Sequence, residues 1–334
     1  MNPVKPPVLS FRASCLRHAV RWLLTASLLV VLGYGVYVAV RFHHVDNRIY
    51  RWWSGRDART LQASREPGLR LERYRMDAAG RPVEGIDRNL SGLAFDAERQ
   101  RLIAVINRPA TLLTLDLDGR VTGRHRLRNA SDVEGVAFLG GGRVALVEEG
   151  SQRILLATLP RDGKDADLDL RDAPSLRLDL GAGTVPADAD GAKAPGQRRN
   201  QGLEGIGYDL ERDQLYVVKE HSPRALYRIT GWGRPAQDAP AAFAVEDLSA
   251  WLRQSVGATD LSSIEVDPDT GHLLLLSDES QSLVELDRRG ARVGGTSLEG
   301  VPQAEGVALG SDGTLYIVSE PNLFYRLRPG ATPP

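Results

Sequence analysis

The sequence predicts an all-β fold, a β-propeller with five four-stranded blades, preceded by one N-terminal transmembrane helix. The main observation is a six-residue phrase that occurs five times, each time followed by a short turn and a second apolar run. Its second residue is Ser or Glu, and its third is Gly in four of the five copies. The copies are LSGLAF at 90–95, VEGVAF at 133–138, LEGIGY at 203–208, LSSIEV at 261–266 and AEGVAL at 304–309. Recurrence on this scale indicates a repeat architecture.

The spacing of the copies fits propeller blades. Two of the intervals are 43 residues long, and a blade needs about 40–50 residues. The two longer intervals contain residues 181–199 and 231–240, which are rich in Gly, Pro, Ala and charged residues and are typical of surface loops. Six blades remain the alternative, if one of these insertions contains a degenerate blade.

The second repeat shows the strand pattern of one blade. Four apolar runs of strand length are separated by turn residues, with Gly140-Gly141-Gly142 as the first turn. The runs span residues 136–139, 144–148, 154–159 and 176–180. After residue 60 only residues 245–255 suggest a short helix.

The fifth repeat has room for only three strands, because a tail containing Pro and Gly follows residue 328. A propeller closes its ring when the other end of the chain supplies the missing outer strand, which also removes an exposed sheet edge. Residues 69–76, in which Leu69, Leu71 and Arg73 alternate on one face, are predicted to be this strand.

The N-terminal region predicts a membrane anchor. Residues 22–40 carry no charge and have about the length that crosses a bilayer as a helix. Basic residues are concentrated before this segment, which places the N-terminus in the cytoplasm and the propeller in the periplasm. The predicted organisation is a cytoplasmic segment at 1–21, a signal-anchor in the inner membrane at 22–40, a linker at 41–68 and the propeller at 69–330. A cleaved secretory signal is the alternative.

Composition narrows the function classes. The formal net charge is −1, which gives no indication of nucleic-acid binding, and no nucleic-acid partner is predicted. The single cysteine, Cys15, precedes the apolar segment. The propeller therefore has no thiolate for zinc binding or nucleophilic catalysis.

Acidic residues recur at two places in the repeats. The first is the second position of the phrase, and the second is the end of the apolar run that follows. These two strands are antiparallel, so the start of one and the end of the other lie at the same end of the blade, and radial repetition gathers them around one mouth. The acids are Glu134, Glu204, Glu305, Glu149, Glu220, Asp278 and Glu320. Carboxylates without neighbouring His–Cys spacing favour a hard cation, with Ca²⁺ as the first candidate. The alternative is a hydrated tunnel mouth.

Four further residues are candidates for ligand binding at the same mouth: Asn107, Arg108, Lys219 and His221. Asn107 replaces the acid of the first repeat. Arg108 and Lys219 could contact phosphate, and His221 could act as an acid or base near neutral pH. Salt bridges to the acidic residues and an ordinary surface histidine are the competing interpretations.

Several motifs resemble the YjiK/CarP family, also called the SdiA-regulated family. They are NRPA at 107–110, EGVA at 134–137, GLEG at 202–205, AEGVA at 304–308 and VSEPNLFYR at 318–326. The resemblance covers residues 70–328 and implies an inner-membrane-anchored β-propeller linked to calcium response and comparable with propeller phytases. It implies no established catalytic residues.

Three function hypotheses follow. The first is a calcium-binding sensor or interaction platform in the periplasm. The second is a metal-dependent hydrolase that uses the same mouth, either a phytase-like phosphatase acting on a phosphorylated small molecule or a lactonase. The third is a protein-interaction scaffold without metal. Because propellers host many activities, the fold alone does not decide among them.

Overall fold

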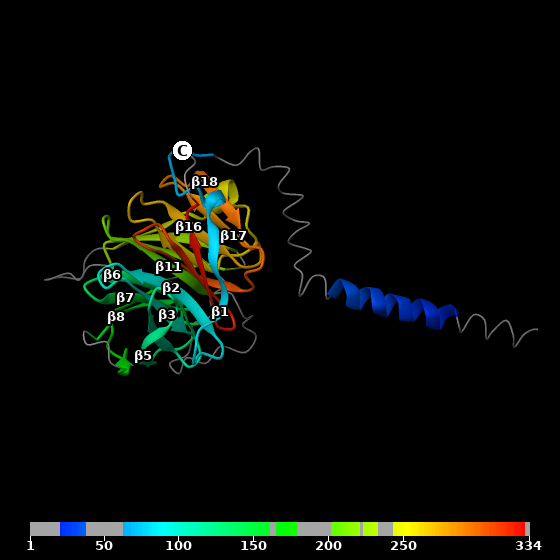
Figure 1. Ribbon diagram of the computed structural model, residues 1–334, viewed down its shortest axis with the longest axis horizontal. Helices are drawn as coiled ribbons and strands as arrows, with labels where there is room; N and C mark the ends of the chain where they lie inside the picture. The colour runs from blue at the N-terminus through cyan, green and yellow to red at the C-terminus, as the bar shows by residue number, and fades with distance from the viewer. Residues whose placement is uncertain are drawn as a thin grey trace, which may run out of the picture. The chain divides into compact units, whose positions relative to one another are not determined.

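The structure is a computed structural model that describes residues 21–37, 63–160, 165–178, 202–220, 223–232 and 243–330 (Figure 1). The chain divides into two compact units, Met1–Trp53 and Ser54–Pro334. In the first unit, residues 21–37 form an α-helix. No helix in the described part of the chain is long and apolar enough to cross a membrane. Residues 38–40 of the predicted span and residues 41–62 of the predicted linker lie outside the described residues.

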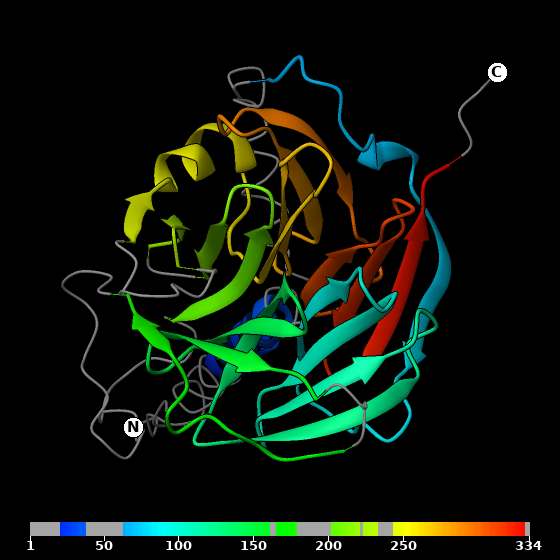
Figure 2. The ribbon, with the colours of Figure 1, turned by 90° about the vertical axis from the view of Figure 1, so that its left-hand side faces the viewer.

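The second unit is a five-bladed β-propeller, whose sheets surround a common centre (Figure 2). Blade 1 contains β2 (Leu90–Asp96), β3 (Arg101–Ile106), β4 (Thr111–Leu115), β5 (Val121–Arg128) and the short parallel strand β9 (Leu168–Asp169). Blade 2 contains β6 (Val133–Gly140), β7 (Arg143–Glu148), β8 (Arg153–Thr158) and β10 (Ser175–Arg177). Blade 3 contains β11 (Leu203–Asp209), β12 (Gln214–Lys219), β13 (Ala225–Thr230) and β14 (Ala244–Asp247).

Blade 4 contains β15 (Ser263–Val266), β16 (Leu273–Ser277), β17 (Ser282–Leu286) and β18 (Arg292–Ser297). Blade 5 contains β19 (Ala304–Leu309), β20 (Leu315–Ser319), β21 (Leu323–Arg328) and β1 (Arg75–Pro82). The prediction of five blades is thus confirmed, and neither long insertion contributes a sixth sheet in the described residues. The repeated phrase forms the inner strand of every blade.

The ring closes as predicted, with a strand from the N-terminal side of the propeller in blade 5, but this strand lies further along the chain than predicted. Figure 2 shows β1 in light blue beside β21 in red, and the two strands pair antiparallel from Arg75↔Arg328 to Pro82↔Leu323. The predicted strand at 69–76 was placed six residues too early, since only its Arg75 and Met76 belong to β1. Its Leu71 instead lies in the 3₁₀ turn η2 (Leu71–Arg73) and is buried in the core. As an edge strand, β1 buries only Ala78 fully, so it has no apolar alternation that a sequence reading could find.

The predicted helix at 245–255 was also placed too early. Val245 pairs with Ile229 and belongs to β14, the outer strand of blade 3. The helical segment follows this strand, as α3 (Ser249–Trp251) and the π-helix η3 (Leu252–Val256). The first residues of the predicted helix therefore form the outer strand of blade 3, although their apolar spacing suggests a helix.

The inner strands contact one another in a closed ring, and this contact explains the glycine of the repeat. A Cβ atom on Gly92 would lie 2.6 Å from the carbonyl oxygen of Glu134, and one on Gly135 would lie 2.7 Å from that of Glu204. A side chain at Gly92 or Gly135 would therefore push neighbouring blades apart, whereas the fourth copy accommodates Ser263 at the equivalent position. The close approach also brings the second residues of successive phrases together, which is what builds the site.

Candidate functional site

A cavity of about 550 Å³ opens at the end of the propeller where the inner strands begin. We call it the mouth cavity. Six glutamates line it: Glu134, Glu149, Glu204, Glu220, Glu305 and Glu320. These are six of the seven acids that the repeat predicts at one mouth. The seventh, Asp278, is not among the lining residues but accepts the backbone N–H of Ala304 at 3.3 Å, next to Glu305.

Local backbone structure aims these side chains at the cavity. Glu134, Glu204 and Glu305 are each the unpaired extra residue of a β-bulge at the start of an inner strand, between partners such as Val133↔Glu148 and Gly135↔Val147. A bulge bends the strand and redirects the side chain it carries. The other three glutamates directly follow the second strands β7, β12 and β20.

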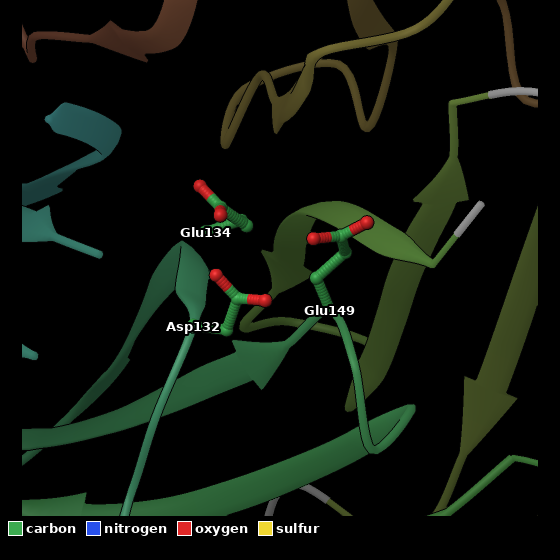
Figure 3. A group of neighbouring side chains, drawn as sticks. All are labelled: Asp132, Glu134 and Glu149. Atoms are coloured by element: carbon green, nitrogen blue, oxygen red, sulfur yellow. The ribbon is translucent and has the colours of Figure 1, made fainter. Parts of the chain in front are cut away.

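Three carboxyl groups lie close together at the mouth cavity: two line it, and the third lies beside it. One oxygen each of Asp132, Glu134 and Glu149 lies within 4.8 Å of the others, and their carboxyl groups gather around a common space (Figure 3). We call these residues the acidic cluster. The backbone N–H of Glu149 donates to the carbonyl of Asp132 at 3.0 Å, which fixes the two chain segments to each other.

Asp132 was missed by the sequence reading. It precedes β6 and has a positive φ of 56°, a conformation that Asp tolerates better than most residues. A weak signal existed, because the residue two positions before the second residue of the phrase is also polar in other repeats, as Asn89 and Gln303 show. Both of these residues also have positive φ.

The neighbours of the acidic cluster hold it in place. Glu134 accepts hydrogen bonds from Ser91 Oγ at 3.0 Å and from Asn107 Nδ2 at 3.0 and 3.2 Å. Arg108 donates to Asp132 through Nε at 3.0 Å and through Nη2. The Oδ1 atom of Asn107 is buried and has no hydrogen-bond partner among the described residues. It is a neutral oxygen available to a cation.

The charges in the mouth cavity are poorly compensated. Burial, together with the charges of Asp132 and Glu149, raises the pKa of Glu134 to about 7. Burial raises the pKa of Glu204 well above its usual value, and the charges of Glu134 and Glu220 add to this effect. The pKa of Glu305 is raised by burial and by Asp278 in the same way. Either protons or a cation must neutralise part of this carboxylate group.

A further carboxyl group with a raised pKa, on a side chain of intermediate exposure, lies on an inner strand outside the mouth cavity. Glu265 of β15 accepts the backbone N–H of Val266 at 2.8 Å, and the backbone of Leu309 in β19 also donates to it. Burial nevertheless raises the pKa of Glu265 to about 8. Glu265 occupies the fifth position of the repeated phrase, where the other copies have Ala or Gly.

Two of the four predicted ligand-binding residues line the mouth cavity. Asn107 and Arg108 line the mouth cavity. Lys219 is not among its lining residues, and its Nζ donates to the carbonyl of Pro223 at 3.3 Å. His221 lies outside the described residues.

The fold and the site define a five-bladed β-propeller with a carboxylate-lined mouth. The chain belongs to the SdiA-regulated family, whose model matches residues 66–328. The resemblance seen in the sequence motifs is thereby confirmed.

Solved structures with a similar fold include a luciferin-regenerating enzyme, with 15% identity and a TM-score of 0.47 over 75% of this chain and 95% of that one. The calcium-binding protein regucalcin from Agrobacterium tumefaciens has 14% identity and a TM-score of 0.45 over 77% and 96%. A gluconolactonase from Xanthomonas campestris has 17% identity and a TM-score of 0.43 over 80% and 96%. At this level of similarity nothing follows about the activity of this chain.

Proposed function

We propose that the protein binds Ca²⁺ at the acidic cluster and acts as a calcium-dependent sensor or interaction platform. The observation that carries this proposal is the convergence of Asp132, Glu134 and Glu149 oxygens within 4.8 Å of one another. Carboxylate and amide oxygens suit a hard cation, and Ca²⁺ accepts six to eight such ligands in flexible geometry. The buried Oδ1 of Asn107 is a fourth candidate ligand.

Arg108 is the feature that competes with a cation, because it already neutralises Asp132. Its side chain is 56% exposed, whereas the side chain of Asp132 is only 9% exposed, so the ion pair is partly solvated. One guanidinium carries a single positive charge, whereas the acidic cluster contains three carboxyl groups. A divalent ion would balance the cluster more completely.

Calcium is expected to raise the melting temperature of the wild-type protein by several degrees. A ligand that binds only the folded state at about 100 times its Kd stabilises it by about 2.7 kcal/mol. The Glu134→Gln variant keeps the shape of the side chain but removes its charge, so its melting temperature should no longer respond to calcium. The exposed Glu299→Gln variant is the matched control and should respond as the wild type does. A full calcium response in Glu134→Gln would place the ion elsewhere.

A metal-dependent hydrolase, either a phosphatase or a lactonase, is the second candidate. It is favoured by Arg88 and Arg108, which line the mouth cavity together with the glutamates and could face an anionic substrate on a bound ion. Phosphatase and lactonase assays with and without calcium separate this candidate from a binding function.

We also propose that the N-terminal segment anchors the chain in the inner membrane with the propeller in the periplasm. The proposal is supported by the uncharged residues 22–40 and by the large exposed apolar side chains of the helix at 21–37, including Trp22 and Leu23 at 74% and 68% exposure. A periplasmic reporter fused after Pro334 should be active, and a cytoplasmic one silent. The reverse pattern would reject this location.

A further inference from the structure

A second cavity, of about 520 Å³, adjoins the mouth cavity on the side of blade 1. The two cavities share Asn107 and Arg108 in their walls, and the second one is also lined by Asp132. We call the second one the side cavity. Because Asp132 belongs to the acidic cluster, a molecule in the side cavity would lie next to any ion bound there.

The side cavity combines an apolar wall with a cationic edge. Pro109, Leu127 and Ala130 contribute apolar surface, whereas Arg108 and Arg126 contribute guanidinium groups. The two segments that carry these residues are joined by the hydrogen bond from the N–H of Leu127 to the carbonyl of Ala110, at 2.9 Å. The cavity is therefore built on the end of a paired sheet.

Arg126 differs from the arginines beside it on the same face of β5. Arg128 forms an ion pair with Asp167 at 2.8 Å, and Arg124 donates to the carbonyl of Gly85 at 3.0 Å. Arg126 lines the side cavity, and its side chain has neither an ion pair nor a hydrogen bond within the described part of the chain. Its guanidinium is thus free to bind an anion.

Arg108, the other guanidinium in the wall of the side cavity, also has N–H donors that make no hydrogen bond with the described residues. Its Nε and Nη2 atoms donate to Asp132, and its Nη1 atom has no partner among the residues that the structure describes. A guanidinium carries five N–H donors in a planar fork, which suits the oxygens of phosphate and carboxylate groups. The charge of Asp132 opposes an incoming anion, and a cation on the acidic cluster would offset that opposition.

We propose that the side cavity binds the anionic group of a small organic phosphate or carboxylate between Arg108 and Arg126, with the apolar part of the ligand on Pro109, Leu127 and Ala130. The enhancement of this binding by calcium rests on the proposed metal function, whereas the contribution of Arg126 does not. Binding of calcium and of this ligand should then be mutually favourable, because an oxygen of the ligand lies beside Asp132 and can coordinate the ion.

Isothermal titration of the full-length chain with phenyl phosphate and with benzoate tests the proposal, with and without calcium. These probes separate phosphate from carboxylate recognition, and inorganic phosphate lacks the apolar part. We expect saturable binding of at least one aromatic probe, tighter than that of inorganic phosphate. Arg126→Gln should weaken it about tenfold, since a charge-assisted hydrogen bond contributes roughly 1.5–3 kcal/mol. The same variant should leave calcium affinity unchanged.

Arg253→Gln is the matched control, because Arg253 is exposed and lies on η3, away from both cavities. Equal probe affinities in wild type, Arg126→Gln and Arg253→Gln would overturn the proposed site. Absence of saturable probe binding up to about 10 mM, with or without calcium, would overturn it as well. Probe binding that depends on Arg126 in a protein that binds no calcium would support the side cavity and reject the proposed metal function.

Discussion

Deletion of residues 1–82 is expected to abolish cooperative unfolding of the propeller, whereas deletion of residues 1–62 is expected to leave it intact. The longer deletion removes β1 and leaves the outer side of β21 unpaired. It also removes Leu71 and Tyr74, which are 0% and 7% exposed and pack in the core between blades 4 and 5. Loss of two such side chains costs roughly 5–8 kcal/mol, a large part of the 5–15 kcal/mol that typically stabilises a domain.

Urea denaturation of the two truncated chains, followed by circular dichroism, measures this effect. The shorter deletion retains η2, β1 and their contacts, so it controls for loss of the N-terminal region in general. Equal transition midpoints and slopes for the two truncated chains would contradict the closure of the ring by β1.

In the presence of a chelator, the free energy of unfolding is expected to fall by several kcal/mol as the pH rises from about 4.5 to about 8. The pKa values of Glu134 and Glu265 are raised from 4.5 to about 7 and about 8 in the folded protein, mainly by burial. Between these values the folded state binds more protons than the unfolded state, so stability is fully present at low pH and is lost as each folded carboxyl group ionises. Glu265 alone accounts for roughly 3–5 kcal/mol.

The Glu265→Gln variant isolates this contribution. It should match the wild type near pH 5 and exceed it in stability near pH 8.5, because Gln occupies the site without ionising. Glu299→Gln, on the exposed surface, should follow the wild type throughout. Urea denaturation at both pH values measures the difference, and an identical pH dependence in wild type and Glu265→Gln would contradict burial of an ionisable group at this position.

The ring of acids could be predicted from the sequence because it depends on connectivity alone. A hairpin must return its second strand to the end where the first began, so Glu204 and Glu220 share one end of blade 3 wherever their strands start. The repeat then applies the same placement to the other blades. Asn107 could be placed at the mouth by the same alignment.

The fine structure of the site could not be predicted in this way. The bulges at Glu134, Glu204 and Glu305 interrupt the pairing of each inner strand with the second strand of its own blade. The adjacent glycines approach the inner strand of the next blade, which is a contact between residues far apart in sequence. Asp132 joins the acidic cluster because its φ is positive and its carbonyl binds the N–H of Glu149. Neither the positive φ of Asp132 nor this hydrogen bond can be recognised from a single amino-acid sequence.

The same limit applies to the edge strand. β1 is held by its pairing with β21 and by ion pairs of Asp77 with Arg326 and Arg328 at 2.9 and 2.6 Å, rather than by an apolar face. The more apolar residues before it, including Leu71, mark a core contact instead of a strand. The apolar residues before β1 therefore indicate burial in the core, and they do not indicate a strand.

Diffraction from crystals grown with saturating calcium, measured at a wavelength where calcium scatters anomalously, tests the central claim most directly. We predict one anomalous peak at about 2.3–2.6 Å from carboxylate oxygens of Asp132, Glu134 and Glu149. A peak at another position with no density in the acidic cluster, or no peak at all, would contradict calcium binding at this mouth.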